Sequence, residues 1–360
     1  MQEFLHILWR SSLILLNWIV KVQYGSIRFK QAFVNVSLLT AGCFSGIDSV
    51  GRKLLSEEDE MKIVQKSSFT YPPDVSDRWK GEIFQPLVDY KFKFLLSDGN
   101  AIEAGVFELL VNGAKEVHAC VSTQAGCKFG CAMCTSGQNG FVRNLMKEEI
   151  LAQINLLSDV ANVQTFDHIV FMGIGEPLDN YDNFVGGVTD LVSGNIAYAG
   201  KLSFATVGLP QKLLRLLQEP IPAFRMLWIS LHAPTDEKRV QIMPVDKAFS
   251  VQKILDAAKK FANRASTEVW INYMLFRGFN DSVDDAKSLA DLLLGTEGIF
   301  SVMITEPNND LPQYQGADVS DLKRFEGYLK EAGMKNRIAR FIAAGKQVNA
   351  GCGEFIFTRM

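Results

Sequence analysis

The chain has 360 residues, of which 48% are hydrophobic and 21% charged, a balance typical of a globular protein with a sizeable core. Its 37 Lys and Arg against 40 Asp and Glu give a net charge of −3. This excludes a chain-wide attraction to phosphate, so a nucleic-acid partner would need a locally basic surface. Six cysteines in a chain of this length exclude a disulfide-stapled scaffold, and four of them lie between Cys120 and Cys134, which indicates metal or redox chemistry in a reducing compartment.

The apolar stretch near the N-terminus does not predict a membrane helix. Arg10 interrupts residues 4–20, so no stretch reaches the roughly 18 uncharged residues of a spanning helix. Residues 39–43, which end in Cys43, resemble a bacterial lipoprotein cleavage box, but the apolar run before them is only about seven residues long. We therefore expect amphipathic helical structure over residues 1–45, a buried or incidental Cys43, no membrane partner and a cytoplasmic protein.

The next part of the chain predicts a linker and then a β-hairpin. Residues 46–90 are more polar, and the sequence Tyr71-Pro72-Pro73 indicates a linker. Two apolar runs, 92–96 and 101–110, flank a turn rich in Asp, Gly and Asn, as in a β-hairpin. We place the main boundary near residues 90–115, and the predicted parts are an N-terminal accessory region (1–89), a β-hairpin extension (90–115), an α/β core (116–354) and a tail (355–360).

From about residue 117 onward, short apolar or β-branched runs alternate with amphipathic segments. This alternation predicts βαβ units, a parallel sheet and the α/β fold class. Six such units are too few for a closed eight-stranded barrel, so we expect a partial (β/α)6 barrel with its functional face at the C-terminal strand ends. The predicted strands are 117–122, 168–174, 202–207, 226–231, 268–276 and 300–305, and the predicted helices include 147–160, 211–218, 250–262, 282–294 and 320–332.

Three cysteines, Cys127, Cys131 and Cys134, follow the first predicted strand of this core. Three thiolates within eight residues can converge on one inorganic cluster, and three ligands would leave one iron open to bind a substrate. The alternatives are a zinc site with a fourth ligand from His118 or an Asp, or three buried cysteines. Zinc sites favour paired C-x2-C elements, which this spacing does not provide.

The spacing C-x3-C-x2-C after a strand resembles the signature of the radical S-adenosylmethionine (SAM) superfamily, with Met133 where that superfamily usually has an aromatic residue. Residues 173–177, Gly-Ile-Gly-Glu-Pro, resemble the superfamily element that contacts the SAM amino group. Glycines let the backbone approach a ligand, and a carboxylate pairs with an ammonium group. The resemblance implies two cofactors, a [4Fe–4S] cluster bound by the three cysteines and SAM.

A narrower resemblance covers residues 90–354. The segments 120–127, 140–145, 172–178 and 229–234, with the terminal Ala-Gly-Cys-Gly of residues 350–353, are similar to the RlmN/Cfr family, which methylates an adenine carbon of RNA with two SAM molecules. A serine that contacts SAM in that family is replaced here by Ala205. The resemblance implies the following roles: Cys352 carries the methyl group, Cys120 forms a disulfide with it, Glu103 is the general base, and Gly175, Glu176, Ser230, Leu231, His232 and Asn308 contact SAM.

Three functions remain open from the sequence. The first is a radical SAM methyltransferase that acts on C2 or C8 of an adenine in rRNA or tRNA, with flavodoxin or ferredoxin as electron donor and the monomer as its functional state. The second is the same mechanism on a small molecule or peptide, which the acidic pI and the divergent N-terminus favour. The third is a noncatalytic iron–sulfur redox sensor. Cations that could contact phosphate in the first case are Arg78, Lys80, Lys91, Lys93, Arg337, Arg340 and Lys346.

Overall fold

The computed structural model of the protein describes residues 61–72, 78–194, 201–220, 224–244, 249–343, 346–351 and 353–359. The expectations for residues 1–60, among them Cys43, and for Cys352 therefore concern residues outside this set. Within these ranges, no helix is both long enough and apolar enough to cross a membrane.

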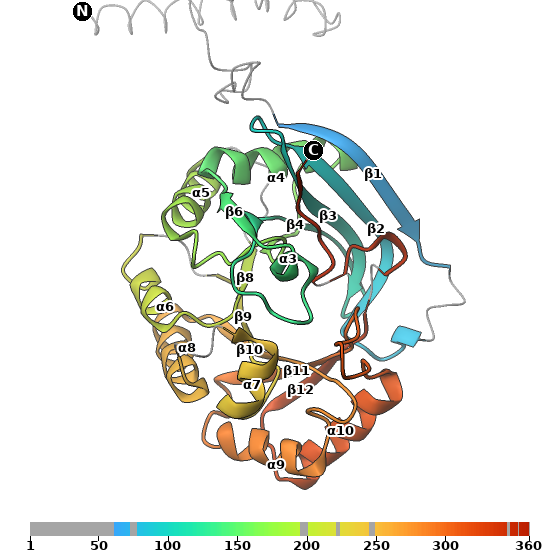
Figure 1. Ribbon diagram of the computed structural model, residues 1–360, viewed down its shortest axis with the longest axis vertical. Helices are drawn as coiled ribbons and strands as arrows, with labels where there is room; N and C mark the ends of the chain where they lie inside the picture. The colour runs from blue at the N-terminus through green and yellow to red at the C-terminus, as the bar shows by residue number, and fades with distance from the viewer. Residues whose placement is uncertain are drawn as a thin grey trace, which may run out of the picture. The chain divides into compact units, whose positions relative to one another are not determined.

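Most of the described strands join one large sheet with the order β1-β2-β3-β4-β7-β8-β9-β10-β11-β12, and β13 pairs with β3 (Figure 1). The strands from β4 to β12 pair in parallel, and the first six of them are the predicted ones. β12 extends this parallel part beyond the prediction. The strands are β1 (Lys62–Thr70), β2 (Phe84–Leu95), β3 (Asn100–Val111), β4 (Ala114–Cys120), β7 (His168–Phe171), β8 (Leu202–Thr206), β9 (Met226–Ser230), β10 (Glu268–Met274), β11 (Phe300–Thr305), β12 (Arg337–Phe341) and β13 (Thr358–Arg359).

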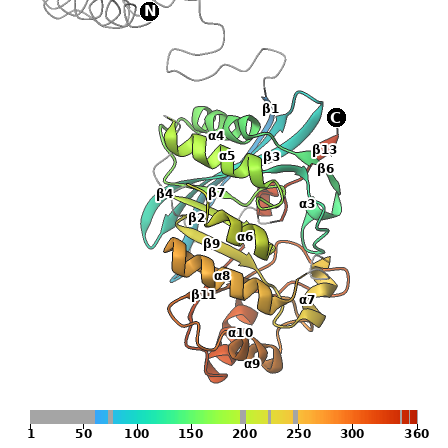
Figure 2. The ribbon, with the colours of Figure 1, turned by 90° about the vertical axis from the view of Figure 1, so that its left-hand side faces the viewer.

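Helices alternate with the parallel strands and cover one face of the sheet (Figure 2). Their starts follow from local sequence: Ser282, for example, caps a helix through a reciprocal pair of hydrogen bonds with Asp285. The five predicted helices are confirmed as α4, α6, α8, α9 and α10. The helices are α3 (Thr135–Gln138), α4 (Lys147–Ala161), α5 (Tyr181–Ser193), α6 (Pro210–Leu216), α7 (Asp236–Ile242), α8 (Val251–Ala265), α9 (Val283–Leu292) and α10 (Val319–Glu331).

The parallel strands have two chemically different faces because successive side chains alternate. On the outer face, Phe184 of α5 packs against Phe171 of β7 and Phe204 of β8 with ring centroids 5.0 and 5.5 Å apart. The alternate residues lie on the opposite face, which we call the inner face. Several of them are only half-buried, which places open space beside them: Val170, Ala205, Met226, Trp228, Ser230 and Asn272.

The prediction of a linker before residue 90 is wrong for the described residues from 61 to 72. β1 pairs antiparallel with β2, and Tyr71 is buried with its hydroxyl 2.5 Å from an Asp89 carboxylate oxygen. The chain that follows contacts the other end of the sheet. Trp79 Nε1 donates to the carbonyl oxygen of Ile342 at 3.3 Å, directly after β12. The β1–β2 pair is therefore an integrated part of the sheet.

Candidate active site

The loop with three cysteines leaves β5 (Gln124–Gly126), which pairs with β6 (Phe141–Asn144). Gly126 has a φ of +78°, and a Cβ there would lie 2.1 Å from the carbonyl oxygen of Gly140, so a larger residue does not fit. The backbone N–H of Cys127 donates to that same carbonyl oxygen at 2.9 Å. Ala132 N–H donates to Ile242 at the end of α7, which anchors the middle of the loop.

The three thiols suit a soft metal cofactor. Burial raises the pKa of Cys127 to about 12 and also raises that of Cys131, and the nearby Cys134 adds to both shifts. The thiols of Cys127 and Cys131 are therefore neutral at physiological pH unless a cationic centre stabilises the thiolates. In the described part of the chain, no three His, Cys, Asp or Glu side chains surround a single ion. An iron–sulfur cluster binds each thiolate to a different iron and so needs a wider arrangement.

Glu176 lies at the C-terminal ends of β7 and β8, after Gly175. Its carboxylate accepts hydrogen bonds from the N–H groups of Val207 at 2.8 Å and Leu178 at 3.0 Å. Burial raises its pKa to about 7, and these hydrogen bonds lower it only in part. No Lys or Arg among the described residues forms an ion pair with it. A buried carboxylate of this kind is a suitable partner for the ammonium group of a ligand.

Gly175 shows why a glycine is required next to this carboxylate. Its φ is +103°, and a Cβ there would lie 2.5 Å from the Cβ of Gln124. The side-chain oxygen of Gln124 accepts a hydrogen bond from Glu176 N–H at 2.9 Å. The close approach of the Gln124 side chain therefore fixes the conformation of the turn that carries Glu176.

The end of β9 is held by Arg239, a residue that the sequence did not single out. Its guanidinium group donates to the carbonyl oxygens of Ser230 at 2.6 Å, Leu231 at 2.8 Å and Val207 at 2.7 Å. Burial lowers the pKa of Arg239 to about 10, so it stays charged at physiological pH. Arg239 is fully buried and connects the ends of β8 and β9.

His232 follows with a positive φ of +59° and a buried ring. Burial lowers its pKa to about 3, so the imidazole is neutral. Its Nδ1 accepts a hydrogen bond from the N–H of Met274 at 3.0 Å, which leaves the proton on Nε2. Of the expected SAM contacts, Ser230, Leu231 and His232 thus share one strand end and the Glu176 turn lies at the end of β7.

Glu103 is on β3, and its carboxylate has two partners from distant parts of the sequence. Lys91 Nζ lies 3.1 Å from Oε2, and the N–H of Ile356 donates to the same oxygen at 2.8 Å. Glu103 is 7% exposed. Cys120, also buried, ends β4 and is in register with Gly105 of β3, two residues beyond Glu103. The two residues therefore lie near each other on adjacent strands.

The neighbours of Cys352 connect the cysteine loop with the end of β11, although Cys352 itself lies outside the described residues. A Cβ at Gly351 would lie 2.2 Å from Nδ2 of Asn308. Gly353 accepts a hydrogen bond from Thr135 N–H at 2.8 Å, one residue after Cys134. No disulfide joins two of the described cysteines. The structure thus brings the tail next to the cysteine loop, Asn308 and Glu103.

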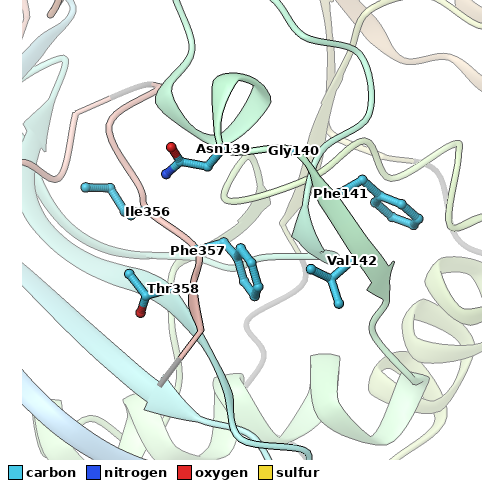
Figure 3. A pocket seen from close by; sticks show the side chains of 7 residues that line it. All are labelled: Asn139, Gly140, Phe141, Val142, Ile356, Phe357 and Thr358. Atoms are coloured by element: carbon cyan, nitrogen blue, oxygen red, sulfur yellow. The ribbon is translucent and has the colours of Figure 1, made fainter.

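The tail also lines a pocket of about 520 Å³ (Figure 3). One wall consists of Ile356, Phe357 and Thr358 of the tail, and the other consists of residues 139–142, which follow α3 and include the start of β6. Phe141 is 40% exposed and points away from the tail (Figure 3). The residues that line the pocket are uncharged.

Several cations that were expected to contact phosphate form ion pairs within the protein instead. Lys91 is paired with Glu103, so its predicted role as a surface cation is not supported. The other ion pairs are Arg78 with Glu306 at 2.6 Å, Arg340 with Glu82 at 2.8 Å, and Arg337 with Glu268 at 3.3 Å.

The chain was compared with known proteins. Residues 121–293 match the radical SAM superfamily. The chain is 37% identical over 266 residues to a probable dual-specificity RNA methyltransferase RlmN from Pseudothermotoga lettingae, covering 73% of this chain and 74% of that protein. It is 32% identical to the dual-specificity RNA methyltransferase RlmN of Campylobacter fetus, over 82% and 87% of the two chains. A radical SAM methyltransferase structure from Sphaerobacter thermophilus matches with a TM-score of 0.69 and 27% identity, over 82% and 81%.

Proposed function

The chain belongs to the RlmN family of radical SAM enzymes, and we propose that it methylates C2 or C8 of an adenine in rRNA or tRNA through a methyl group carried on Cys352. It is a SAM-dependent methyltransferase, and its cofactors are a [4Fe–4S] cluster and SAM. The observation that supports the proposal best is the contact between Glu103 and the tail that carries Cys352, next to the cysteine loop.

Cys127, Cys131 and Cys134 would bind the cluster, which when bound supplies the electron that cleaves SAM into a radical. Glu176 would accept the ammonium group of SAM. Gly175, Ser230, Leu231, His232 and Asn308 would complete the SAM site, and Arg239 would hold the strand ends that shape it.

The remaining steps belong to residues of β3, β4 and the tail. Cys352 would carry the methyl group, and the radical from SAM would take one hydrogen atom from it so that the carbon can bond to the adenine ring. Once this adduct has lost one electron, Glu103 would remove the ring proton. Cys120 would attack the sulfur of Cys352, which releases the product and forms the disulfide. Lys91 and the N–H of Ile356 would orient the Glu103 carboxylate for its step.

The proposed partners are an RNA substrate and a one-electron donor such as flavodoxin or ferredoxin, with the enzyme acting as a monomer in the cytoplasm. A reducing compartment suits an oxygen-sensitive cluster bound by three cysteines. The test is mass spectrometry of rRNA and tRNA from a strain that lacks the gene. We expect the loss of one methyladenosine, restored by the wild-type gene but not by a Cys352→Ala variant. An unchanged set of methylated nucleosides would contradict the proposal.

A second candidate is C-methylation of a small molecule or peptide by the same mechanism. It is favoured by the ion pairs of Arg78, Arg337 and Arg340, which engage cations that RNA phosphates would need. Contacts to RNA phosphates make the affinity for RNA fall as salt is added. An affinity for RNA that does not fall with added salt, together with an unchanged set of methylated nucleosides in the strain without the gene, would favour this candidate.

A further inference from the structure

Asn280 is a fully buried polar residue at the C-terminal edge of the parallel strands. It lies in the loop between β10 and α9, on the side of the sheet where the loops of parallel α/β folds carry functional groups. An amide buried to this degree lowers the stability of a protein unless its oxygen and its NH2 group have hydrogen-bond partners. The partners of Asn280 therefore indicate which segments its side chain connects.

The side chain of Asn280 connects the chain after β9 with the end of β10. Its Nδ2 donates to the carbonyl oxygen of His232 at 2.7 Å and to that of Met274, the last residue of β10, at 2.8 Å. Its Oδ1 accepts from the N–H of Phe276 at 2.7 Å. Two carbonyl acceptors and one N–H donor need a side chain with both an NH2 group and an oxygen, so an amide fits and a carboxylate does not.

His232 has a backbone conformation that needs this support. Its φ of +59° lies in the left-handed region, which is unfavourable for a residue with a Cβ and persists only where the surroundings hold it. Its N–H donates to the carbonyl oxygen of Asn272 at 3.2 Å, and its carbonyl oxygen accepts from Asn280. The two peptide groups that flank His232 are therefore fixed, one by a carbonyl of β10 and the other by the Asn280 amide.

The ring of His232 is held by the same end of β10. The N–H of Met274 donates to Nδ1, while the carbonyl oxygen of Met274 accepts from Asn280. The proton of the neutral imidazole is then on Nε2, and no described residue accepts a hydrogen bond from this atom. Nε2–H is thus the donor that the ring can offer to a ligand.

Asn280 is itself held in place by its backbone. The hydroxyl of the fully buried Tyr273 donates to the carbonyl oxygen of Asn280 at 2.9 Å. The N–H of Asn280 donates to the carbonyl oxygen of Phe276 at 3.3 Å. A side chain on a fixed backbone can hold its partners in one arrangement, because little of its own freedom remains to be lost.

We propose that Asn280 is a positioning residue of the SAM site, which holds His232 in its left-handed conformation so that Leu231 and His232 keep the orientation in which they contact SAM. This inference rests on the proposed SAM contacts and adds a residue that acts through them. Without the amide, the carbonyl oxygen of His232 loses its donor. The chain after β9 can then relax from the left-handed conformation, which turns the imidazole away from its present direction.

The test measures the affinity of the reconstituted holoenzyme for SAM by equilibrium dialysis, together with the iron bound per chain and urea unfolding. Asn280→Asp keeps an acceptor for the N–H of Phe276 and removes both donors, so it should weaken SAM binding by about tenfold. Asn280→Ala removes the amide without adding a carboxyl group and should weaken binding at least as much. The iron content of both variants should equal that of the wild type.

Asn336 offers a matched control at the other end of the strands. It is also a buried asparagine, and its Nδ2 donates to Thr296 and to the carbonyl oxygen of Phe300, where β11 begins. Asn336→Asp and Asn336→Ala remove buried hydrogen bonds of the same kind, so they should lower the free energy of unfolding. Their affinity for SAM should stay within about threefold of the wild type, because Asn336 is distant from the SAM contacts.

A double-mutant cycle with His232→Phe separates positioning from a general loss of stability. This substitution keeps an aromatic ring but removes the ring N–H. Since Asn280 acts through His232, Asn280→Asp should weaken SAM binding by less than about threefold when His232→Phe is already present.

Three results would overturn the proposal. The first is wild-type affinity for SAM in both Asn280 variants. The second is an equal loss of SAM affinity in the Asn336 variants, which would assign the effect to the fold. The third is additive losses in the cycle with His232→Phe. In each case the wild-type enzyme still binds SAM, so the proposed function would stand. A wild-type holoenzyme that does not bind SAM would instead refute the proposed function and this inference with it.

Discussion

Replacing Lys91 with methionine should destabilise the protein, because it leaves the buried carboxylate of Glu103 without its cation. The two groups lie 3.1 Å apart, and their side chains are 11% and 9% exposed, so water screens the pair weakly. Removing one partner of a buried ion pair costs about 3–5 kcal/mol. The N–H of Ile356 still donates to Glu103 and offsets part of the loss, so we expect a decrease of about 3 kcal/mol in the free energy of unfolding.

The assay is a double-mutant cycle followed by urea unfolding at neutral pH, with Lys91→Met, Glu103→Gln and the double variant. Glu103→Gln removes the charge that Lys91 neutralises, so the double variant should be at least about 1 kcal/mol more stable than the sum of the single losses predicts. Lys91→Arg keeps the cation and should lose less than about 1 kcal/mol. Additive losses in the cycle would refute the reasoning, because the charge of Lys91 would then not act on Glu103.

The affinity for SAM should rise by up to about tenfold per pH unit as the pH increases toward 7, because burial raises the pKa of Glu176 to about 7 and only its ionised form pairs with an ammonium group. Equilibrium titrations with SAM at several pH values up to 7 test this prediction. The Glu176→Gln variant should bind SAM with an affinity that does not depend on pH. A wild-type affinity for SAM that is independent of pH would contradict the prediction. Gly126→Ala should lower the iron bound per chain to about half or less, because the new Cβ would collide with the carbonyl oxygen of Gly140. Gly130→Ala is its control, since that glycine also has a positive φ but open space around it, and equal iron contents would refute the steric argument. Arg239→Met should weaken SAM binding by about tenfold or more, because three strand-end carbonyls lose a buried donor; a variant of lower thermal stability but unchanged affinity would show that Arg239 acts on the fold alone.

The parallel part of the fold could be predicted because its pattern has one cause. Outer-face residues such as Leu202 and Phe204 are buried under helices, and this produces short apolar runs at regular spacing. β12 was not predicted because Arg337 and Arg340 interrupt the apolar run expected of a buried strand. The structure shows that both arginines form ion pairs with glutamates. β1 escaped because it lies at the edge of the sheet, where most of its side chains are exposed and no apolar alternation is required.

The candidate site could be predicted where its residues are close in sequence and not where its contacts are distant. The cysteine spacing and the Gly175-Glu176 turn are local, so the sequence alone predicts them. The guanidinium group of Arg239 donates to backbone carbonyl oxygens at the ends of β8 and β9. Every residue type has a backbone carbonyl, so the sequence does not show which residues accept these hydrogen bonds. Lys91 was expected to contact phosphate because the first strand of the predicted hairpin began at residue 92. In the structure β2 also includes Lys91, and its ammonium group reaches Glu103 on β3.

The tail is the clearest case of a site built from backbone contacts. Gly353 accepts from Thr135, Phe355 accepts from Ser136, and Ile356 donates to Glu103. All three contacts use backbone atoms of the tail, so they do not depend on its side chains. Only the glycines of the tail indicate from the sequence that it packs closely against the rest of the protein. Gly351 is one such mark, because any Cβ at that position would collide with Asn308. The close packing that requires a glycine there also holds the neighbours of Cys352 beside the cysteine loop, which a methyl carrier needs if it is to meet a radical formed at that loop.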